Sequence, residues 1–467
     1  MRKISINNFR GFKNQQFNFS KVNILIGENS GGKSSFLKFL LALKQTILEK
    51  DINLKLYGKF VDLGNYKEII YEHNDNNNLS FSFDFNSVDY FDFYFWYILQ
   101  VAEEFEDKQK DIFEKQVKGY IGEGIHYPTT IKLKLNKNLN NHHVIKIEFS
   151  NNFLGKVQIE HKPPQNKTEN IQDFIGENPR CKITFKNNNK ILVLDEVEYT
   201  GNSFLSLITG ASLKKRIEEK SKDDSIFYKI AFLLIIQNYL TYNLGIIRYV
   251  NPLLASPKRH YEVRDYSDSM EVNLEKMVTF LGDSKRPVNE RHQALQLINN
   301  ALNIFGLADS ISINTENPRV YELRAKIKGL ESNITDIGFG VSVQLPILFQ
   351  IIRSQLRRRG ETILIEQPEL HLHPKLQAMF IDTILKIGFN NTYFIETHSE
   401  HIIRKLQSIV KNKTIDLKRD DITIHYFKRE NEKFVVTQHS INENFRVVPN
   451  LPSGFFDASY LLARERM

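Results

Sequence analysis

Hydrophobic residues near the N-terminus follow the pattern of a strand, a loop and a helix. Ile4 to Phe9 alternates apolar and polar residues, and Val22 to Ile26 is a short, mostly apolar run with β-branched residues that is typical of a buried strand. From Ser35 to Lys50 the apolar residues recur at helical spacing. The pattern therefore predicts a βα start over residues 1 to 50.

The pattern changes twice in the middle of the chain. Within 65–200, short alternating runs such as Leu79–Phe85 and Val144–Phe149 are separated by polar, Asn-rich turns, which favours an antiparallel β region. Over 203–302 the spacing of apolar residues becomes helical, with interruptions at prolines. This segment predicts a helical insertion.

Strands and helices alternate again toward the C-terminus. Apolar runs predict strands at 311–327, 362–365 and 392–396, and helical spacing predicts helices at 343–358 and 374–387. The alternating run 422–427 predicts a closing strand. The chain as a whole is therefore expected to have an α/β fold, with an antiparallel β region and a helical insertion between its two α/β parts.

Composition narrows the class of protein. With 467 residues, 41% of them hydrophobic, the chain can bury a large core and hold two or three structural units. No run approaches the ~20 apolar residues of a membrane span, so we expect a cytoplasmic protein with no membrane partner. Cys181 is the one cysteine, which excludes an internal disulfide and favours a buried small side chain. A net charge of +8 is compatible with nucleic acid, but the basic residues are scattered.

The loop between the predicted strand and helix at the N-terminus reads G-E-N-S-G-G-K-S, a complete phosphate-binding loop. In such a loop the backbone N–H groups and the helix N-terminus surround phosphates, the lysine reaches the β- and γ-phosphates, and the serine hydroxyl binds Mg²⁺. The sequence therefore predicts ATP and Mg²⁺ as cofactors. The predicted nucleotide-binding residues of the loop are Gly27, Glu28, Asn29, Ser30, Gly31, Gly32, Lys33, Ser34 and Ser35.

Two later strands end in polar residues suited to the same site. The strand at 362–365 is followed by Glu366 and Gln367, where a P-loop enzyme places the carboxylate that holds Mg²⁺, so Ser34 and Glu366 are the predicted metal ligands. His398 follows the strand at 392–396 and can sense the γ-phosphate; the alternative is an ordinary surface or capping histidine. Because 339 residues separate Gly27 from Glu366, the fold must bring the two halves of the site together.

Taken together, N-F-R-G-F, G-E-N-S-G-G-K-S, G-F-G-V-S-V-Q, I-L-I-E-Q-P-E-L-H-L-H-P and I-E-T-H-S-E-H resemble the ATPase heads of the ABC superfamily outside transporters, the SMC-like, overcoming-lysogenization-defect-like AAA ATPases. The runs Gly58–Gly64 and Pro452–Asp457 resemble bacterial AAA proteins with an uncharacterised C-terminal domain, which overlap the ATPase subunits of anti-phage systems such as Septu and some retrons.

This resemblance implies roles for further residues. Ser342, with Gly338 and Gly340, would be the signature segment that contacts ATP held by a second copy, and His398 would be the switch histidine. Two ATPs would then lie between two chains, which implies a homo-oligomer with dimeric heads or more. Gln367 stands where these ATPases carry a general base and can only orient water, so hydrolysis is expected to be slow unless Glu369 takes over that role.

The resemblance also implies the domain organisation. An N-terminal ATPase lobe with the P-loop and antiparallel region would span 1–202, a helical insertion 203–310, and a C-terminal ATPase lobe with signature, Walker B acid and switch histidine 311–467. The fold class expected is an α/β, ABC-type P-loop ATPase head assembled from both ends of the chain.

Three functions remain open at this stage. The first is an ATPase whose ATP-driven head dimerisation regulates an effector, such as an HNH nuclease, in anti-phage defence. The second is a clamp that holds ATP without turning it over and binds DNA or a protein, which Gln367 favours. The third is a nuclease of the overcoming-lysogenization-defect type, but the 69 residues after His398 leave no room for the Toprim domain of those enzymes.

Overall fold

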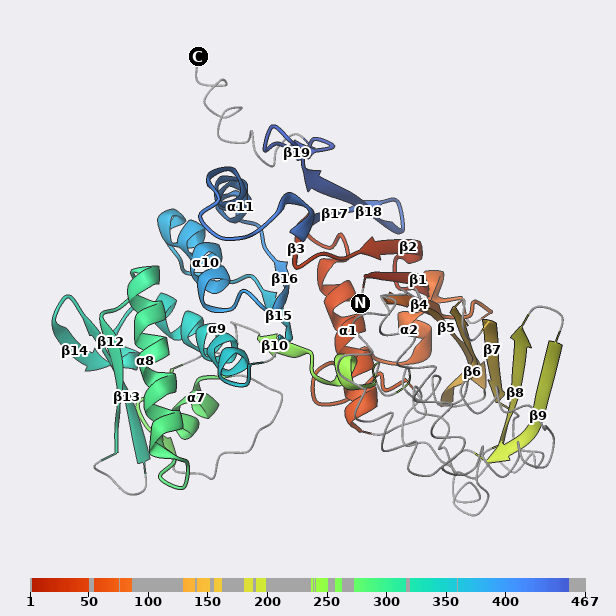
Figure 1. Cartoon of the computed structure of the whole chain (residues 1–467), viewed down its shortest axis with the longest axis horizontal. Helices are drawn as coiled ribbons and strands as arrows, with labels where there is room; N and C mark the ends of the chain where they lie inside the picture. Colours follow the sequence, from red (N-terminus) through yellow and green to blue (C-terminus); the bar gives the residue numbers. More distant parts are fainter. Residues whose placement is uncertain are drawn as a thin grey trace, which may run out of the picture. The chain divides into compact units, whose positions relative to one another are not determined.

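The fold is described from a computed structural model of the whole chain (Figure 1). The described residues are 2–49, 54–74, 76–85, 129–138, 141–151, 155–161, 180–187, 190–198, 237, 239, 241–250, 257–262, 273–315, 320–358 and 360–452. They form two compact units. The first consists of Met1–Asn18, Ser35–Gly245 and Glu430–Val435, and the second of Phe19–Ser34, Ile246–Arg429 and Val436–Met467.

An antiparallel sheet of eight strands forms the main element of the first unit, in the order β2-β1-β4-β5-β6-β7-β8-β9. Its strands are β1 (Lys3–Phe9), β2 (Phe12–Asn18), β4 (Ser80–Phe85), β5 (Thr129–Asn138), β6 (Asn141–Asn151), β7 (Gly155–His161), β8 (Arg180–Asn187) and β9 (Lys190–Glu198). In β5, Ile131 and Leu133 are buried while Lys132 and Lys134 are exposed, because successive side chains of a strand point to opposite faces. The antiparallel region predicted from the alternating pattern is confirmed.

The rest of the described first unit is helical or irregular. The long helix α1 (Lys33–Leu48) enters this unit from Ser35 onward, and its buried residues include Phe36 and Phe39. A single turn, α2 (Tyr66–Ile69), begins with a capping box in which the Asn65 and Glu68 side chains bond to each other's backbone N–H groups. A 3₁₀ turn, η1 (Tyr71–His73), follows it.

The second unit contains a sheet of seven strands, in the order β10-β15-β16-β3-β17-β18-β19. Its strands are β3 (Val22–Gly27), β10 (Arg248–Val250), β15 (Thr362–Glu366), β16 (Thr392–Glu396), β17 (Ile422–Glu430), β18 (Lys433–Ile441) and β19 (Val447–Val448). The first five strands in this order are parallel, so the N-terminal strand β3 lies between β16 and β17 from the far end of the chain. The predicted assembly of one α/β sheet from both ends of the chain is confirmed (Figure 1).

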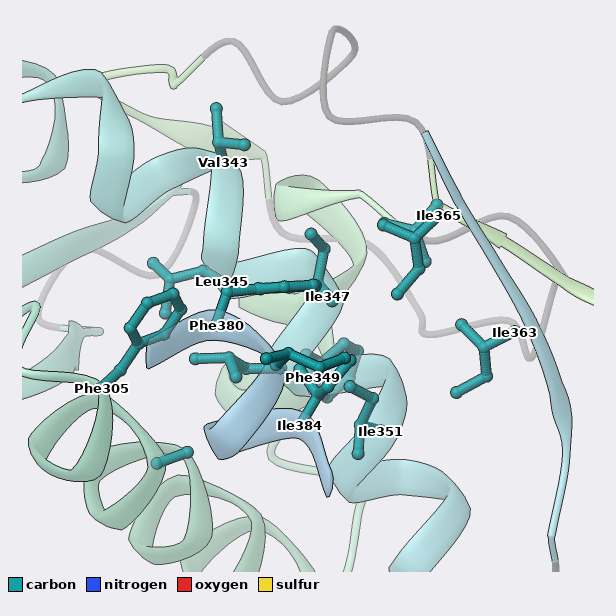
Figure 2. Packing of buried hydrophobic residues seen from close by; sticks show 14 of the residues in the cluster. Phe305, Val343, Leu345, Ile347, Phe349, Ile351, Ile363, Ile365, Phe380 and Ile384 are labelled. Atoms are coloured by element: carbon teal, nitrogen blue, oxygen red, sulfur yellow. The ribbon is translucent and has the colours of Figure 1, made fainter. Parts of the chain in front are cut away.

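Helices of the second unit contribute most of the apolar side chains of its core. They are α7 (Leu274–Gly282), α8 (Val288–Phe305), α9 (Phe339–Leu356), α10 (Pro374–Ile387) and α11 (Glu400–Asn412). Every residue of α9 from Val341 to Ser354 is buried, which explains why apolar residues occur on all sides of this helix. Figure 2 shows Leu345 and Phe349 of this helix among Phe305 of α8 and Phe380 of α10. The α9 helix begins four residues before the predicted 343.

A smaller antiparallel sheet completes the second unit. It has the order β11-β13-β12, with β14 paired to β13, and its strands are β11 (Tyr261–Glu262), β12 (Ser310–Asn314), β13 (Val320–Ile327) and β14 (Leu330–Asn333). Two short 3₁₀ turns, η4 (Ile334–Asp336) and η5 (Arg419–Asp421), precede α9 and β17. Helix α8 packs on β12.

A buried ion pair braces the parallel sheet at the start of β15. The Arg248 and Glu361 side chains, 7% and 2% exposed, meet at 3.0 Å. Gln350 of α9 donates to the second Glu361 carboxylate oxygen at 2.5 Å, and Arg357 donates to the first at 3.1 Å. Charge-assisted bonds of this kind satisfy the buried carboxylate oxygens and tie α9 and β10 to β15.

The compact units divide the chain differently from the predicted ranges 1–202, 203–310 and 311–467. Strand pairing explains the difference: β3 joins the C-terminal strands, and β10, inside the predicted helical insertion, pairs with β15. The insertion does contain α7 and α8. Its part at 203–236 and the C-terminal segment from Ser453 lie outside the described residues, as does the side chain of Cys181. Among the described residues, no helix combines the length and apolar content of a membrane span.

Candidate functional site

Parallel strand pairing brings the polar ends of three strands together in the second unit. Glu366, the last residue of β15, is paired with Glu396, the last residue of β16, and Glu396 is paired with Leu25 of β3. β3 then runs directly into the glycine loop. The carboxyl ends of parallel strands are where ligands gather in α/β proteins, so the P-loop and the two acids occupy a functional edge of the sheet.

The glycine loop is held against the end of β17. The Glu28 N–H donates to the Phe427 carbonyl at 2.9 Å, and the Gly31 N–H donates to the Glu28 carbonyl at 3.2 Å. Gly27 has a φ of +130°, and a Cβ atom at this position would lie 2.0 Å from the Phe427 carbonyl oxygen. Glycine is therefore required at residue 27 both by the close approach of β17 and by its backbone conformation.

The first residues of α1 supply the cation and the hydroxyl of the loop. The buried Lys33 ammonium donates to the carbonyls of Gly27 and Glu28, at 3.0 and 2.8 Å. Burial lowers the pKa of Lys33, with Glu396 and Glu28 acting in the opposite direction. Ser34 is exposed, and its hydroxyl donates to Glu396. A helix N-terminus with a lysine at this position is suited to bind phosphate.

Glu396 is the carboxylate in direct contact with the loop. Its two oxygens lie 3.0 and 3.2 Å from Ser34 Oγ, and the residue is 3% exposed. Burial, followed by the charge of Glu366, raises the pKa of Glu396 to about 7, although the Ser34 hydrogen bond and Lys33 lower it. Glu396 therefore changes its charge near neutral pH, at the point where the P-loop serine offers its hydroxyl.

The turn after β15 is shaped by backbone hydrogen bonds to β16. Gln367 has a φ of +42°, and its N–H donates to the Glu396 carbonyl at 2.7 Å. The Glu369 carboxylate accepts the backbone N–H of His398 at 2.6 Å. Burial raises the pKa of Glu369, and the hydrogen bond from the His398 N–H works against that rise. Glu369 thus joins the turn after β15 to the residue predicted as the switch.

His398 lies beyond the end of β16 with an exposed side chain. Although the residue is exposed overall, part of the ring is shielded from solvent; this partial desolvation, with the charge of Lys33 as the second cause, lowers the pKa of His398. A histidine with a lowered pKa is neutral at physiological pH and offers one ring N–H as a donor. His398 is therefore a neutral group that feels the charge of the P-loop lysine.

The predicted signature residues pack on the turn after β15. Gly338 precedes α9 and is exposed, whereas Ser342 is fully buried and donates to the Phe339 carbonyl at 2.8 Å. A Cβ atom on Gly340 would meet the His371 carbonyl oxygen at 3.3 Å. Gln344 of the same helix donates to the Pro368 carbonyl at 2.6 Å. Helix α9 and the turn after β15 are thus in direct contact.

The residues of the site fit a nucleoside triphosphate with Mg²⁺. The start of α1 presents N–H groups that have no intrahelical acceptor, Lys33 is a buried cation, and Ser34 and Glu366 are the hard oxygen donors that Mg²⁺ prefers. When bound, Mg²⁺ would neutralise phosphate charge, and Ser34 and Glu366 would hold it. Within the described residues, no cluster of three His, Cys, Asp or Glu side chains is arranged as a metal site.

The structure brings together most of the predicted site residues and adds one. The P-loop, Glu366, Gln367, Glu369 and His398 lie at one edge of the sheet, and the signature residues contact that edge through the turn. Sequence reasoning missed Glu396, although it follows an apolar strand in the same way as Glu366. The available signal was that both β15 and β16 end in a glutamate. The order of the strands in the sheet was needed to show that Glu396 lies beside the P-loop.

Comparison with known proteins gives one family and a group of distant structures. The family model described as AAA ATPase domain matches residues 1–403. No curated protein sequence matches the chain significantly. The crystal structure of an SMC head bound to the C-winged helix domain of ScpA is similar at 12% identity and a TM-score of 0.45, with 95% of this chain and 98% of that chain covered.

Two other SMC heads show the same degree of likeness. The SMC head domain from Thermotoga maritima has 9% identity and a TM-score of 0.39, and covers 93% of this chain and 97% of that chain. An SMC head with an extended coiled coil, bound to the C-terminal domain of ScpA derived from Pyrococcus furiosus, has 11% identity and a TM-score of 0.40. The match covers 100% of this chain and 99% of that chain.

Proposed function

The chain belongs to the family of AAA ATPase domains, and on that premise we propose that it binds ATP with Mg²⁺ at the P-loop edge of the parallel sheet and hydrolyses it. The observation that carries the proposal is the contact of Ser34 with Glu396, beside Lys33 and Glu366. This contact would join Ser34 and Glu396, more than 360 positions apart in the sequence, in one site for phosphate and metal.

Each residue of the site has a separate role in this proposal. Lys33 exchanges its two backbone acceptors for phosphate oxygens, and the N–H groups of the loop hold the same phosphates. His398, neutral at physiological pH, donates a hydrogen bond toward the γ-phosphate, and Glu369 holds its backbone in place. Gln367 orients water but takes no proton, so we expect slow turnover.

Nucleotide binding also regulates assembly in this proposal. The predicted signature segment would face a second copy through the exposed Gly338 at the start of α9, since Ser342 is fully buried, so that two chains close on two ATPs and reopen on hydrolysis. The contact of α9 with the turn 367–372 supports such coupling, since Gln344 donates to the carbonyl of Pro368, which lies between Gln367 and Glu369. The closed dimer would regulate a separate effector, such as an HNH nuclease, in anti-phage defence.

A clamp that holds ATP without turnover is the second candidate. Gln367 favours it, and so does the engagement of Glu369 with the His398 N–H, which occupies the other acid available as a base. The clamp would bind DNA or a protein instead of being cycled by hydrolysis.

Nucleotide affinity, phosphate release and mass in solution test these functions together. We expect wild-type protein to bind ATP and to dimerise with ATP but not with ADP, and Lys33→Met to lose both properties. Lys38→Met on the exposed face of α1 is the matched control. Phosphate release would favour the ATPase, and ATP-dependent dimerisation without release would favour the clamp. Wild-type protein that takes up no nucleotide would refute both.

A further inference from the structure

The contact between Ser34 and Glu396 differs from the predicted metal site, which paired Ser34 with Glu366. Both Glu396 oxygens lie within hydrogen-bond distance of the Ser34 hydroxyl, at 3.0 and 3.2 Å. Ser34 is exposed to solvent, whereas Glu396 is buried and only 3% exposed. The carboxylate therefore lies on the inner side of the hydroxyl that the P-loop offers to a cation.

The backbone of Glu396 is fixed from both sides. β16 is paired in parallel with β3 at Leu25 and with β15 at Glu366, and the Glu396 carbonyl accepts the Gln367 N–H at 2.7 Å. The Thr397 N–H continues the ladder by donating to the Leu25 carbonyl at 3.0 Å. A central strand held in this way presents its last side chain at a constant position, which a metal site needs.

Two carboxylates at neighbouring strand ends repel each other, and a cation between them removes that repulsion. Glu366 and Glu396 are register partners on adjacent strands. The ammonium of Lys33 is the nearby protein cation, but it donates to two backbone carbonyls. Mg²⁺ is commonly bound by one or two carboxylates together with phosphate oxygens, and it demands oxygen donors in a fixed arrangement.

We propose that Glu396 is a second acidic ligand of the nucleotide's divalent cation, acting with Ser34 and Glu366. This inference rests on the proposed function and adds a residue to the site. In the chain without ligand, Ser34 donates to Glu396; with the cation bound, the oxygens of both side chains face the metal in place of each other. The carboxylate thus keeps the P-loop serine in position for the cation.

Calorimetric titration with ADP, in magnesium chloride and in EDTA, tests the assignment. Magnesium should tighten ADP binding by the wild-type chain, and E396Q, which keeps the shape and removes the charge, should lose about 10- to 100-fold of that enhancement. In EDTA the two proteins should bind ADP equally, or E396Q more tightly, because a negative charge near the phosphates is gone. E400Q, four residues further on, removes an acid that pairs with Arg404 at 3.1 Å and should behave as wild type.

Two further variants keep the test decisive if E396Q folds poorly. Glu396→Asp retains the charge but withdraws it by one methylene, so it should lose part of the magnesium enhancement. Ser34→Ala should lose enhancement as well, and the double variant S34A/E396D should lose less than the sum of the two, because both side chains serve one ion. Full magnesium enhancement in E396Q or E396D would overturn the assignment, whereas a wild-type chain that binds no ADP would instead refute the proposed function beneath it.

Discussion

Replacing Glu396 with glutamine should stabilise the ligand-free protein above neutral pH. Burial and Glu366 raise the pKa of Glu396 from 4.5 to about 7. For a carboxylate whose pKa is raised by folding, the stabilising contribution is present below the unfolded pKa and is lost as the pH rises through the folded pKa. Wild-type protein should therefore lose stability between about pH 4.5 and pH 8 through this one residue.

The size of the effect follows from the same pKa change. One pKa unit corresponds to about 1.4 kcal/mol, so the ionised Glu396 destabilises the fold by up to roughly 3 kcal/mol at pH 8. Glutamine carries no charge and can still accept the Ser34 hydrogen bond. For a unit of this size, 1 kcal/mol shifts the melting temperature by about 2–4 °C, so E396Q should melt roughly 6–12 °C higher at pH 8.

Differential scanning fluorimetry in EDTA, without nucleotide, over about pH 5 to pH 8 measures this difference. Other titrating groups are common to the two proteins and cancel when their melting temperatures are subtracted. E400Q is the control, since Glu400 lies four residues further along on the solvent side of α11 and pairs with Arg404. If the gap between E396Q and wild type stays constant across the pH range, the raised pKa of Glu396 is refuted.

Three further substitutions test the glycine loop, the buried Arg248–Glu361 ion pair and the buried His425. Gly27→Ala should abolish ADP binding in calorimetry while circular dichroism stays native, because its Cβ would lie 2.0 Å from a carbonyl oxygen; Gly306→Ala, in open space, should bind normally. Glu361→Ala should lower the free energy of unfolding in urea by about 3–5 kcal/mol, since it leaves buried Arg248 without its carboxylate, and a change below 1 kcal/mol would contradict that role. Burial and His439 lower the pKa of His425 to about 3, so the neutral ring stabilises the fold and this stabilisation is lost as the pH falls from about 6.5. His425→Phe should therefore reduce the fall in melting temperature on acidification, and an unchanged fall would exclude His425 as its cause.

Sequence reasoning predicted the local elements of the site well. Val22–Ile26, 362–365 and 392–396 are the strands β3, β15 and β16, and the glycine loop leads into α1 as expected. These elements follow from short-range physics: apolar runs bounded by polar turns, helical spacing, and glycine where the backbone needs it. The α9 helix was predicted four residues short because Gly340 and Ser342 interrupt the apolar pattern at its start without ending the helix.

The sequence by itself indicated the P-loop and the acid at the end of β15, because both are local patterns. Only the tertiary structure decided which of them touch. Pairing of β3 with β16, separated by about 370 residues, selects Glu396 as the partner of Ser34, and pairing of β10 with β15 creates the Arg248–Glu361 brace. Strand order is settled by burial and backbone pairing summed over a whole sheet, and no single segment contains that information.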